Sequence, residues 1–266
     1  MKPHARSTRF VPAALGLAFL VACQKAPVVW SDAVWMPLSP GRLAVDSGGR
    51  TRLVAPLPAP PTLPGGATRC EQSFRFAWVD SMRVFAAWWT PRPDRSAALM
   101  ASYSADGGRT WKAPSPVDSS DVSAVGCDRP APALAADGST VHVAYSLTSS
   151  EGTGIFFAHS MDNAGLFHSP VPVEYGSRLG AAAVAARGDR VLVAYEDPDD
   201  RSRIGLAISA TMGHIFESHA SATDDVGEAT SPDIALNGRT LAVSWTDRAS
   251  PDGARAVRMI RVGRLR

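Results

Sequence analysis

The residues of this chain that could do chemistry are charged side chains that recur at one position of an internal repeat. In chain order, this position carries Glu71, Asp128, Arg178 and Glu228. Carboxylates grouped with a guanidinium could hold a cation or a polar ligand, or supply general acids and bases. Arg75 and Arg129 lie close to this position in the repeat and would add positive charge. The alternative is a rim of solvated charges that binds nothing.

A second group consists of aromatic residues and carboxylates at the ends of the later strands. The equivalent aromatic residues are Trp88, Tyr145, Tyr195 and Trp245, and Glu196 follows the third of them. Aromatic residues with nearby carboxylates are typical of carbohydrate sites, because the faces of sugars stack on the rings. Large residues at equivalent positions also suit packing between repeats. Tyr195 and Glu196 are adjacent in a strand, so their side chains point to opposite faces and cannot touch.

Four internal repeats position these residues. Residues 70–88 align without a gap on residues 127–145, and further copies begin near residues 177 and 227. Each copy has the pattern strand, polar turn, strand, and its short apolar runs are rich in the residues that favour strands. Repeats of this length are typical of propellers and solenoids. We therefore expect an all-β fold with one sheet for each repeat.

A second hairpin follows each of the first three copies, and the turn of the first hairpin is the most specific motif in the chain. Its pattern Ser-x-Asp-x-Gly-x-Thr-Trp is made by Ser104, Asp106, Gly108, Thr110 and Trp111. Glycines in such a turn supply the positive φ that a tight hairpin needs. Residues 160–167 are a worn copy that ends in Phe167, and residues 209–216 have lost the aspartate.

This pattern resembles the Asp box, or BNR repeat, of sialidase-like β-propellers. The resemblance implies that Asp106 caps turn amides, that Trp111 packs beneath the sheet, and that ligands bind on the face opposite these turns. It also implies a small β-propeller of four to five blades, because the chain is too short for the six usual in sialidases. Residues 42–54 carry Gly-Gly-Arg-Thr in the same register. We expect them to complete the last blade or to form a short extra one.

The same resemblance makes catalysis difficult to assign. Sialidases clamp the substrate carboxylate with three arginines and use a Tyr–Glu pair and an acid/base aspartate. Phe74 and Arg75 keep only the first two residues of the family's Phe/Tyr-Arg-Ile-Pro motif, and no arginine triad can be assigned. We therefore assign no catalytic residue and predict a non-catalytic binding or scaffold module for a protein or glycan partner. The alternatives are an exo-sialidase-type glycoside hydrolase and an accessory subunit of a membrane-associated complex.

The N-terminus is typical of an export signal. A basic segment precedes the apolar residues 10–22, which are too few to span a bilayer. The sequence Leu-Val-Ala-Cys that ends at Cys23 resembles a bacterial lipobox, which implies a signal peptide over residues 1–22 and a lipid on Cys23. Gln24 then favours the outer membrane, with the protein facing the periplasm or the exterior. The alternative is an ordinary signal peptide with an incidental cysteine.

The remaining features define one domain without a cofactor. We expect a tether over residues 23–41 and a single propeller over residues 42–266, with a Pro-rich connector at residues 55–66. Cys70 and Cys127 occupy the same repeat position, so in an oxidising compartment they would form a disulfide, or else remain two free thiols. The six histidines show no zinc-like spacing, which predicts no metal site. The net charge of +2 does not favour nucleic acid as a partner.

Overall fold

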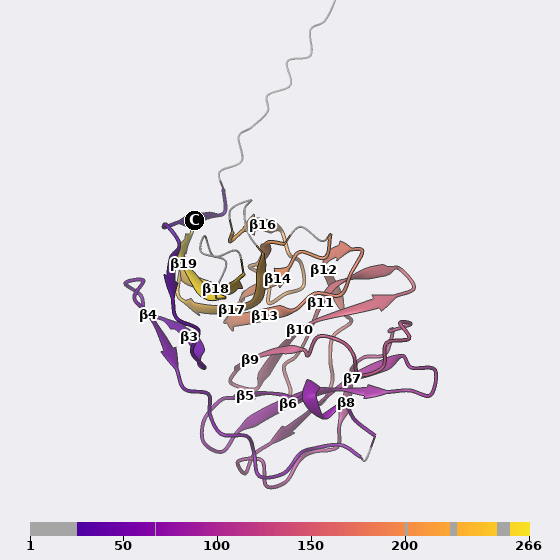
Figure 1. Ribbon diagram of the computed structural model, residues 1–266. Helices are drawn as coiled ribbons and strands as arrows, with labels where there is room; N and C mark the ends of the chain where they lie inside the picture. The colour runs from indigo at the N-terminus through magenta and orange to yellow at the C-terminus, as the bar shows by residue number, and fades with distance from the viewer. Residues whose placement is uncertain (1–25, 67, 200–201, 224–227, 249–255) are drawn as a thin grey trace, which may run out of the picture.

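The computed structural model describes residues 26–66, 68–199, 202–223, 228–248 and 256–266, and the chain is all-β over these ranges (Figure 1). The described part contains one short 3-10 helix, η1 (Glu71–Ser73). None of its helices is both long and apolar enough to cross a lipid bilayer. The predicted all-β class is therefore confirmed. Cys23 and the predicted signal peptide lie outside the described residues.

Three repeats each form a four-stranded antiparallel sheet in which the strands follow one another in chain order. The first sheet contains β5 (Arg75–Trp78), β6 (Val84–Pro91), β7 (Ala97–Ser104) and β8 (Ser115–Asp118). The second contains β9 (Ala133–Asp137), β10 (Thr140–Ser149), β11 (Gly152–Ser160) and β12 (Val171–Gly176). The third contains β13 (Ala182–Arg187), β14 (Arg190–Glu196), β15 (Ile204–Ser209) and β16 (Ser218–Ser221).

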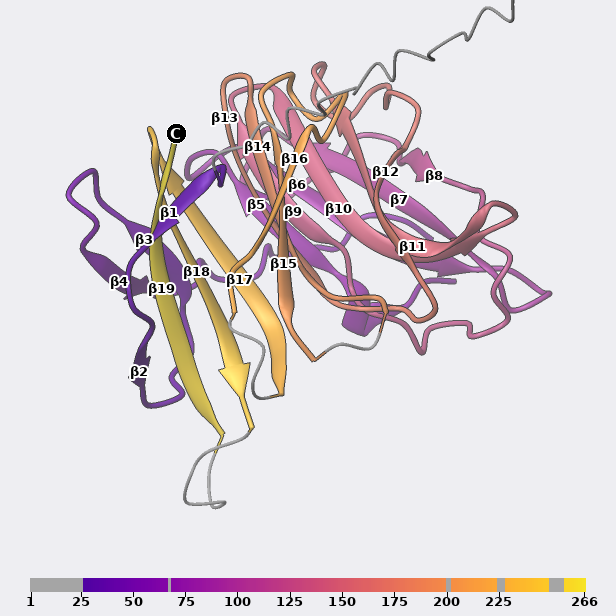
Figure 2. The same ribbon diagram turned by 90° about the horizontal axis from the view of Figure 1, so that it is seen from above.

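The fourth sheet joins the two ends of the described chain. It contains β17 (Ala229–Asn237), β18 (Thr240–Asp247) and β19 (Val257–Leu265), and its outer edge is completed by β1 (Val28–Trp30) and β2 (Val34–Met36). Both N-terminal strands pair antiparallel with β19 and lie beside it in Figure 2. This pairing satisfies backbone groups of β19 that would otherwise form an open edge. Residues 28–36 were expected to be tether, so the structure corrects that boundary.

The predicted N-terminal hairpin exists but forms a separate two-stranded sheet of β3 (Arg42–Val45) and β4 (Thr51–Val54). The backbone amide of Leu43 donates a hydrogen bond of 2.7 Å to the carboxylate of Asp233 in β17. The hairpin is therefore docked against the fourth sheet. It does not complete that sheet, because β1 and β2 already cover the edge of β19.

The first strands of neighbouring sheets lie side by side around a common centre. β5 contacts β9, β9 contacts β13, β13 contacts β17, and β17 contacts β3 (Figure 1). Each first strand runs outward from a cavity at its starting end to a tight turn at its far end. We call these the cavity end and the turn end of the molecule. The capped turns at residues 104–111, 160–167 and 209–216 follow third strands and lie at the turn end.

Apolar side chains fill the spaces between the sheets. The four equivalent aromatic residues are almost fully buried, and each packs in the core on the side of the preceding element: Trp88, Tyr145, Tyr195 and Trp245. Tyr145 meets Trp89 of the first sheet edge-on, with ring centroids 6.0 Å apart. At Trp88 the Pro-rich connector takes this place, and Gly65 lies against the indole ring. These residues pack between the sheets, which was one of the two interpretations of their repeat equivalence.

A disulfide ties the first two sheets together. Cys70 and Cys127 are bonded, with their Cα atoms 5.3 Å apart. This pairing is the one predicted from their equivalent positions in the repeat. It fixes the two chain segments that lead into β5 and β9, and thus the start of two of the strands that line the cavity.

Candidate functional site

The first capped turn shows how the local sequence fixes the turn end. One carboxylate oxygen of Asp106 accepts hydrogen bonds from the Ser104 hydroxyl (2.7 Å) and from the amides of Arg109 (3.0 Å) and Thr110 (2.9 Å). The other accepts from the Thr110 hydroxyl at 2.6 Å. Hydrogen bonds to the charged form hold the pKa of Asp106 well below its ordinary value. Gly108 has φ +81° and lies on Pro60, where a Cβ would come within 2.3 Å of the proline ring.

The second and third capped turns keep this geometry with different side chains. Asp162 accepts from the Ser160 hydroxyl (2.6 Å) and from the amides of Gly165 and Leu166, each at 3.0 Å. In the third turn, Thr211 replaces the aspartate, and its hydroxyl accepts from the Ile215 amide at 3.2 Å. The motif is therefore a structural cap in all three turns. A ligand site outside these caps would therefore lie at the cavity end or beside the turns.

The central cavity lies where the inner strands begin. It has a volume of about 420 Å³ and is lined by residues of β3, β5, β9, β13 and β17 and of the segments that lead into them. Among the described lining residues, the ionisable side chains are those of Arg42, Arg75 and Asp233. Prolines and alanines form most of the remaining wall. The cavity thus presents two guanidinium groups and one carboxylate against an otherwise uncharged lining.

Asp233 is positioned by a β-bulge. The register of β17 against β18 shifts between Thr230 and Asp233, and Ser231 has φ +55°. Bulges re-aim side chains in this way. The Asp233 carboxylate accepts from the amides of Leu43 (2.7 Å) and Ile234 (2.9 Å). Burial raises the pKa of Asp233 above its ordinary value, although these amides and the charge of Arg42 oppose the shift. This carboxylate holds the β3–β4 hairpin in place.

The four charged residues of the repeat position do not line the cavity, although all four lie in the described part of the chain. Glu71 is exposed in η1, and its nearest cation is Arg69 at 3.9 Å. Asp128 and Glu228 are exposed. Arg178 is half-buried, and its backbone amide bonds the Pro198 carbonyl. Each of these residues belongs to the segment before its strand and is absent from the described lining of the cavity.

Tyr195 and Glu196 point in different directions, as the alternation of strand side chains requires. The Tyr195 hydroxyl donates to Glu174 of β12 at 3.0 Å. Burial, followed by the charge of Glu174, raises the pKa of Tyr195 well above its ordinary value. The two carboxylate oxygens of Glu196 accept from the amides of Ser231 (2.8 Å) and Ala181 (3.1 Å). Both residues therefore join neighbouring strands, and neither is placed as part of a nucleophile–base pair.

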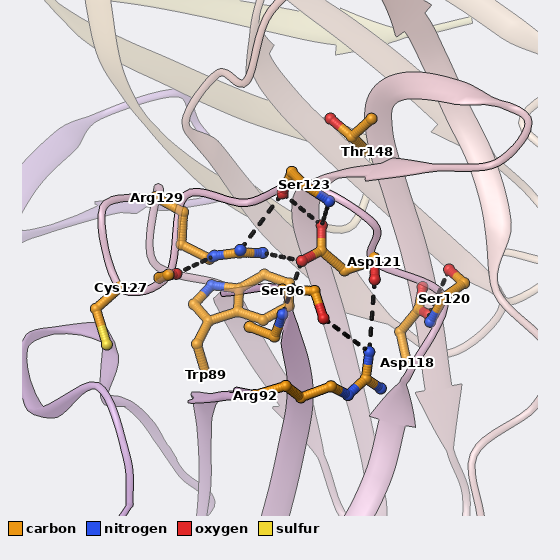
Figure 3. Close-up of polar contacts among 12 residues, drawn as sticks. Trp89, Arg92, Ser96, Asp118, Ser120, Asp121, Ser123, Cys127, Arg129 and Thr148 are labelled. Atoms are coloured by element: carbon orange, nitrogen blue, oxygen red, sulfur yellow. Dashed lines mark hydrogen bonds and ion pairs between the residues drawn. The ribbon is translucent and has the colours of Figure 1, made fainter. Parts of the chain in front are cut away.

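Arg129 is buried in a network that sequence analysis did not identify (Figure 3). Its guanidinium forms an ion pair of 2.9 Å with Asp121, and both side chains are almost completely shielded from solvent. The guanidinium also lies 4.9 Å from the ring centre of Trp89, and its Nε donates to the Gly126 carbonyl at 2.7 Å. Asp121 in turn accepts from the Ala97 amide at 2.8 Å. These contacts fix the loop between β8 and β9 and leave Arg129 enclosed, away from any ligand.

The second group that the sequence did not predict consists of histidines at the turn end. His159, His168 and His214 come together there, although their spacing in the chain gave no sign of a metal-ligand set. The sequence does mark these histidines in another way. All three lie within or beside the second and third capped turns, where the motif differs from that of the first turn.

Comparisons with known proteins give a likeness of fold. No family model matches the chain, and no curated protein sequence matches it significantly. A solved protein of unknown function from Dyadobacter fermentans superposes with a TM-score of 0.50 and 17% identity, over 69% of this chain and 50% of that chain. The endosialidase of phage phi92 (TM-score 0.48, 11% identity) covers 72% of this chain and 35% of its own.

A GH93 α-L-arabinofuranosidase of Fusarium graminearum gives a TM-score of 0.46 and 14% identity, over 68% of this chain and 58% of its own. The chain thus spans between about a third and three fifths of the length of these three proteins. Sialidases and other glycoside hydrolases are therefore among its structural neighbours, all at low sequence identity.

Proposed function

We propose that this chain is a non-catalytic binding module, built on a small sialidase-like propeller and tethered to the bacterial envelope. Four sheets and the β3–β4 hairpin would be its five blades, the hairpin being a reduced one. The support for five is the sequence of contacts among the inner strands, in which β3 follows β17 around the cavity. Rigid sheets that hold variable loops are a common scaffold for binding, and the fold alone does not determine the chemistry.

The observation that carries this proposal is the charge of the cavity. Arg42 and Arg75 supply two guanidinium groups, and Nη1 of Arg75 also donates to the carbonyls of Gln72 (3.2 Å) and Phe74 (2.8 Å). The carboxylate of Asp233 is already bonded to two backbone amides. A planar guanidinium matches a carboxylate in charge and in geometry. The cavity therefore suits the carboxylate of an acidic sugar at the end of a glycan partner.

The same charges argue against hydrolysis. Glycoside hydrolases generally place two carboxyl groups about 5 to 9.5 Å apart on either side of the scissile bond. Among the described residues that line the cavity, Asp233 is the one carboxylate. The tyrosine and glutamate that resemble a sialidase pair, Tyr195 and Glu196, are held by contacts between strands. We therefore expect binding of an acidic glycan without turnover.

A binding experiment with matched arginine variants tests the proposal. Sialyl- and glucuronyl-oligosaccharides would be titrated into the purified protein by calorimetry, with Arg42→Gln and Arg75→Gln each weakening binding about tenfold or more, as expected for loss of a charge-assisted pair. Arg52→Gln, on the exposed face of β4, is the control and should bind normally. Release of free sugar during the titration would show a hydrolase instead. Equal binding by all variants would exclude the cavity as the site.

Attachment to the membrane is a separate part of the proposal and rests on the sequence around Cys23. A lipid on this residue would anchor the chain without a membrane-spanning helix. In cells, the unchanged chain should fractionate with the outer membrane, and Cys23→Ser should appear in the soluble fraction. Unchanged fractionation of Cys23→Ser would contradict lipid anchoring through this residue.

A further inference from the structure

The histidines at the turn end come from two different sheets. His159 is near the end of β11, His168 follows the second capped turn, and both belong to the second sheet. His214 lies in the third capped turn and belongs to the third sheet. The rings of His159 and His168 are stacked with centroids 4.4 Å apart, and the ring of His214 meets that of His159 edge-on at 4.9 Å.

The third capped turn lies beside the second sheet because its backbone is in close contact with an aromatic ring of that sheet. Gly213 has φ +89° and lies on the ring of Phe157, where a Cβ would come within 2.1 Å of a ring carbon. Phe216 packs edge-on against the same ring, with centroids 5.4 Å apart. Because Gly213 has no side chain, the turn can rest on Phe157, and His214 then lies over His159. The backbone amide of His168, the third histidine of the cluster, donates to the His159 carbonyl at 3.0 Å, which holds His168 beside His159.

The three imidazoles are arranged as a ligand set. One ring nitrogen of each lies within 4.8 Å of one ring nitrogen of each of the others. His159 is 2% exposed, and its Nε2 is buried without a hydrogen-bond partner among the described residues. An unpaired buried polar atom is unfavourable and calls for an explanation. His168 and His214 are exposed, so their side chains can turn toward a ligand.

We propose that His159, His168 and His214 bind one Zn²⁺ ion between the second and third sheets. Neutral imidazole is a preferred ligand of Zn²⁺, and three protein ligands with a water molecule complete its tetrahedron. In such a site the ligand nitrogens lie roughly 3.3 Å apart, as follows from Zn–N distances of about 2.0 to 2.1 Å. Because the ring nitrogens all lie within 4.8 Å of one another, each separation would have to shorten by no more than about 1.5 Å to meet this requirement.

The site lies at the surface between two neighbouring sheets. The fourth position would face solvent on the side of the two exposed rings. The ion would cross-link two sheets that share no backbone hydrogen-bond ladder.

Titration of chelator-treated, tag-free protein with Zn²⁺ tests this proposal. We expect one ion per chain by calorimetry, a higher melting temperature with Zn²⁺, and a tetrahedral ligand-field spectrum with Co²⁺. His168→Ala and His214→Ala should each weaken Zn²⁺ binding by more than about tenfold. Because both side chains are exposed, the metal-free variants should melt at the same temperature as the metal-free unchanged protein.

His219→Ala is the matched control. His219 is an exposed histidine of β16 outside the cluster, and its Nε2 forms a hydrogen bond of 3.1 Å with the Val173 carbonyl. This variant should retain full Zn²⁺ affinity. The proposal is overturned if the His168→Ala/His214→Ala double variant binds Zn²⁺ as tightly as the unchanged protein. It is also overturned if His219→Ala loses as much affinity as the cluster variants. Neither result would bear on glycan binding at the cavity end.

Discussion

The cavity end and the turn end differ in how their polar side chains are used. At the cavity end, the polar residues that stand out in the repeat, such as Glu196 and Arg129, are bonded to backbone amides, carbonyls or a buried carboxylate. At the turn end, the capped turns satisfy their own backbone, and the buried Nε2 of His159 beside them has no hydrogen-bond partner among the described residues. At the end of the molecule that the sequence favoured for a site, these side chains thus make structural contacts.

The repeats explain this difference. A residue that recurs in every copy serves a role that every copy shares, which is to pack on the neighbouring copy and to satisfy the backbone of its own loop. Trp88 and Tyr195 illustrate this need, since each is buried toward the preceding element. A ligand site occurs once in the molecule, so its residues are expected where one copy departs from the others. Arg42 in the β3–β4 hairpin and His214 in the third capped turn, which we propose as ligand residues, lie at such departures.

Breaking the buried ion pair should have the largest effect on stability. Arg129→Met leaves the Asp121 carboxyl without its partner and shielded from water, and loss of one partner from a buried pair costs about 3 to 5 kcal/mol. Urea denaturation would measure the change in the free energy of unfolding. Arg129→Met combined with Asp121→Asn should recover part of it, because Asn can still accept from the Ala97 amide. A loss below about 1 kcal/mol in the single variant, as is usual for exposed pairs, would mean that the cavity end does not depend on this network.

A smaller effect on the free energy of unfolding is expected at Tyr195, and it tests whether this tyrosine is structural or a nucleophile. Tyr195→Phe removes the hydrogen bond to Glu174 and should lower the free energy of unfolding by about 1 kcal/mol. Tyr175→Phe is the matched control, because that hydroxyl is exposed and lies 3.5 Å from Glu151. Its stability should be unchanged. If Tyr195→Phe instead left stability intact and changed the handling of an acidic glycan, the assignment of Tyr195 to packing would be wrong.

The sequence predicted the sheets better than the site, for physical reasons. Strand alternation and glycine turns are local, so the repeat alignment placed the strand hairpins and paired Cys70 with Cys127. The strands β1 and β2 are three residues each and have no repeat partner, and only the open edge of β19 explains their pairing. The cavity charges Arg42 and Asp233 are 191 residues apart in the sequence. A β-bulge that no local pattern indicates turns Asp233 toward β3. Spacing along the sequence therefore does not predict that these residues lie close together.

The smallest expected effect on stability comes from a comparison of the first and third capped turns, which lie at the same end of the molecule. Asp106→Asn keeps the shape of the side chain but loses its charge, so we expect a modest drop in stability at pH 7. Because the folded-state pKa of Asp106 is depressed, its contribution is complete above the unfolded value of about 3.9 and declines as the pH falls below that value. The difference in unfolding free energy between the unchanged protein and Asp106→Asn should therefore shrink between pH 5 and pH 2. Thr211→Val removes the corresponding acceptor of the third turn, which does not titrate, and its difference should stay constant over this range. If both differences shrank together, acid would be acting on the fold as a whole, and the charge of Asp106 would not be what distinguishes the first turn from the third.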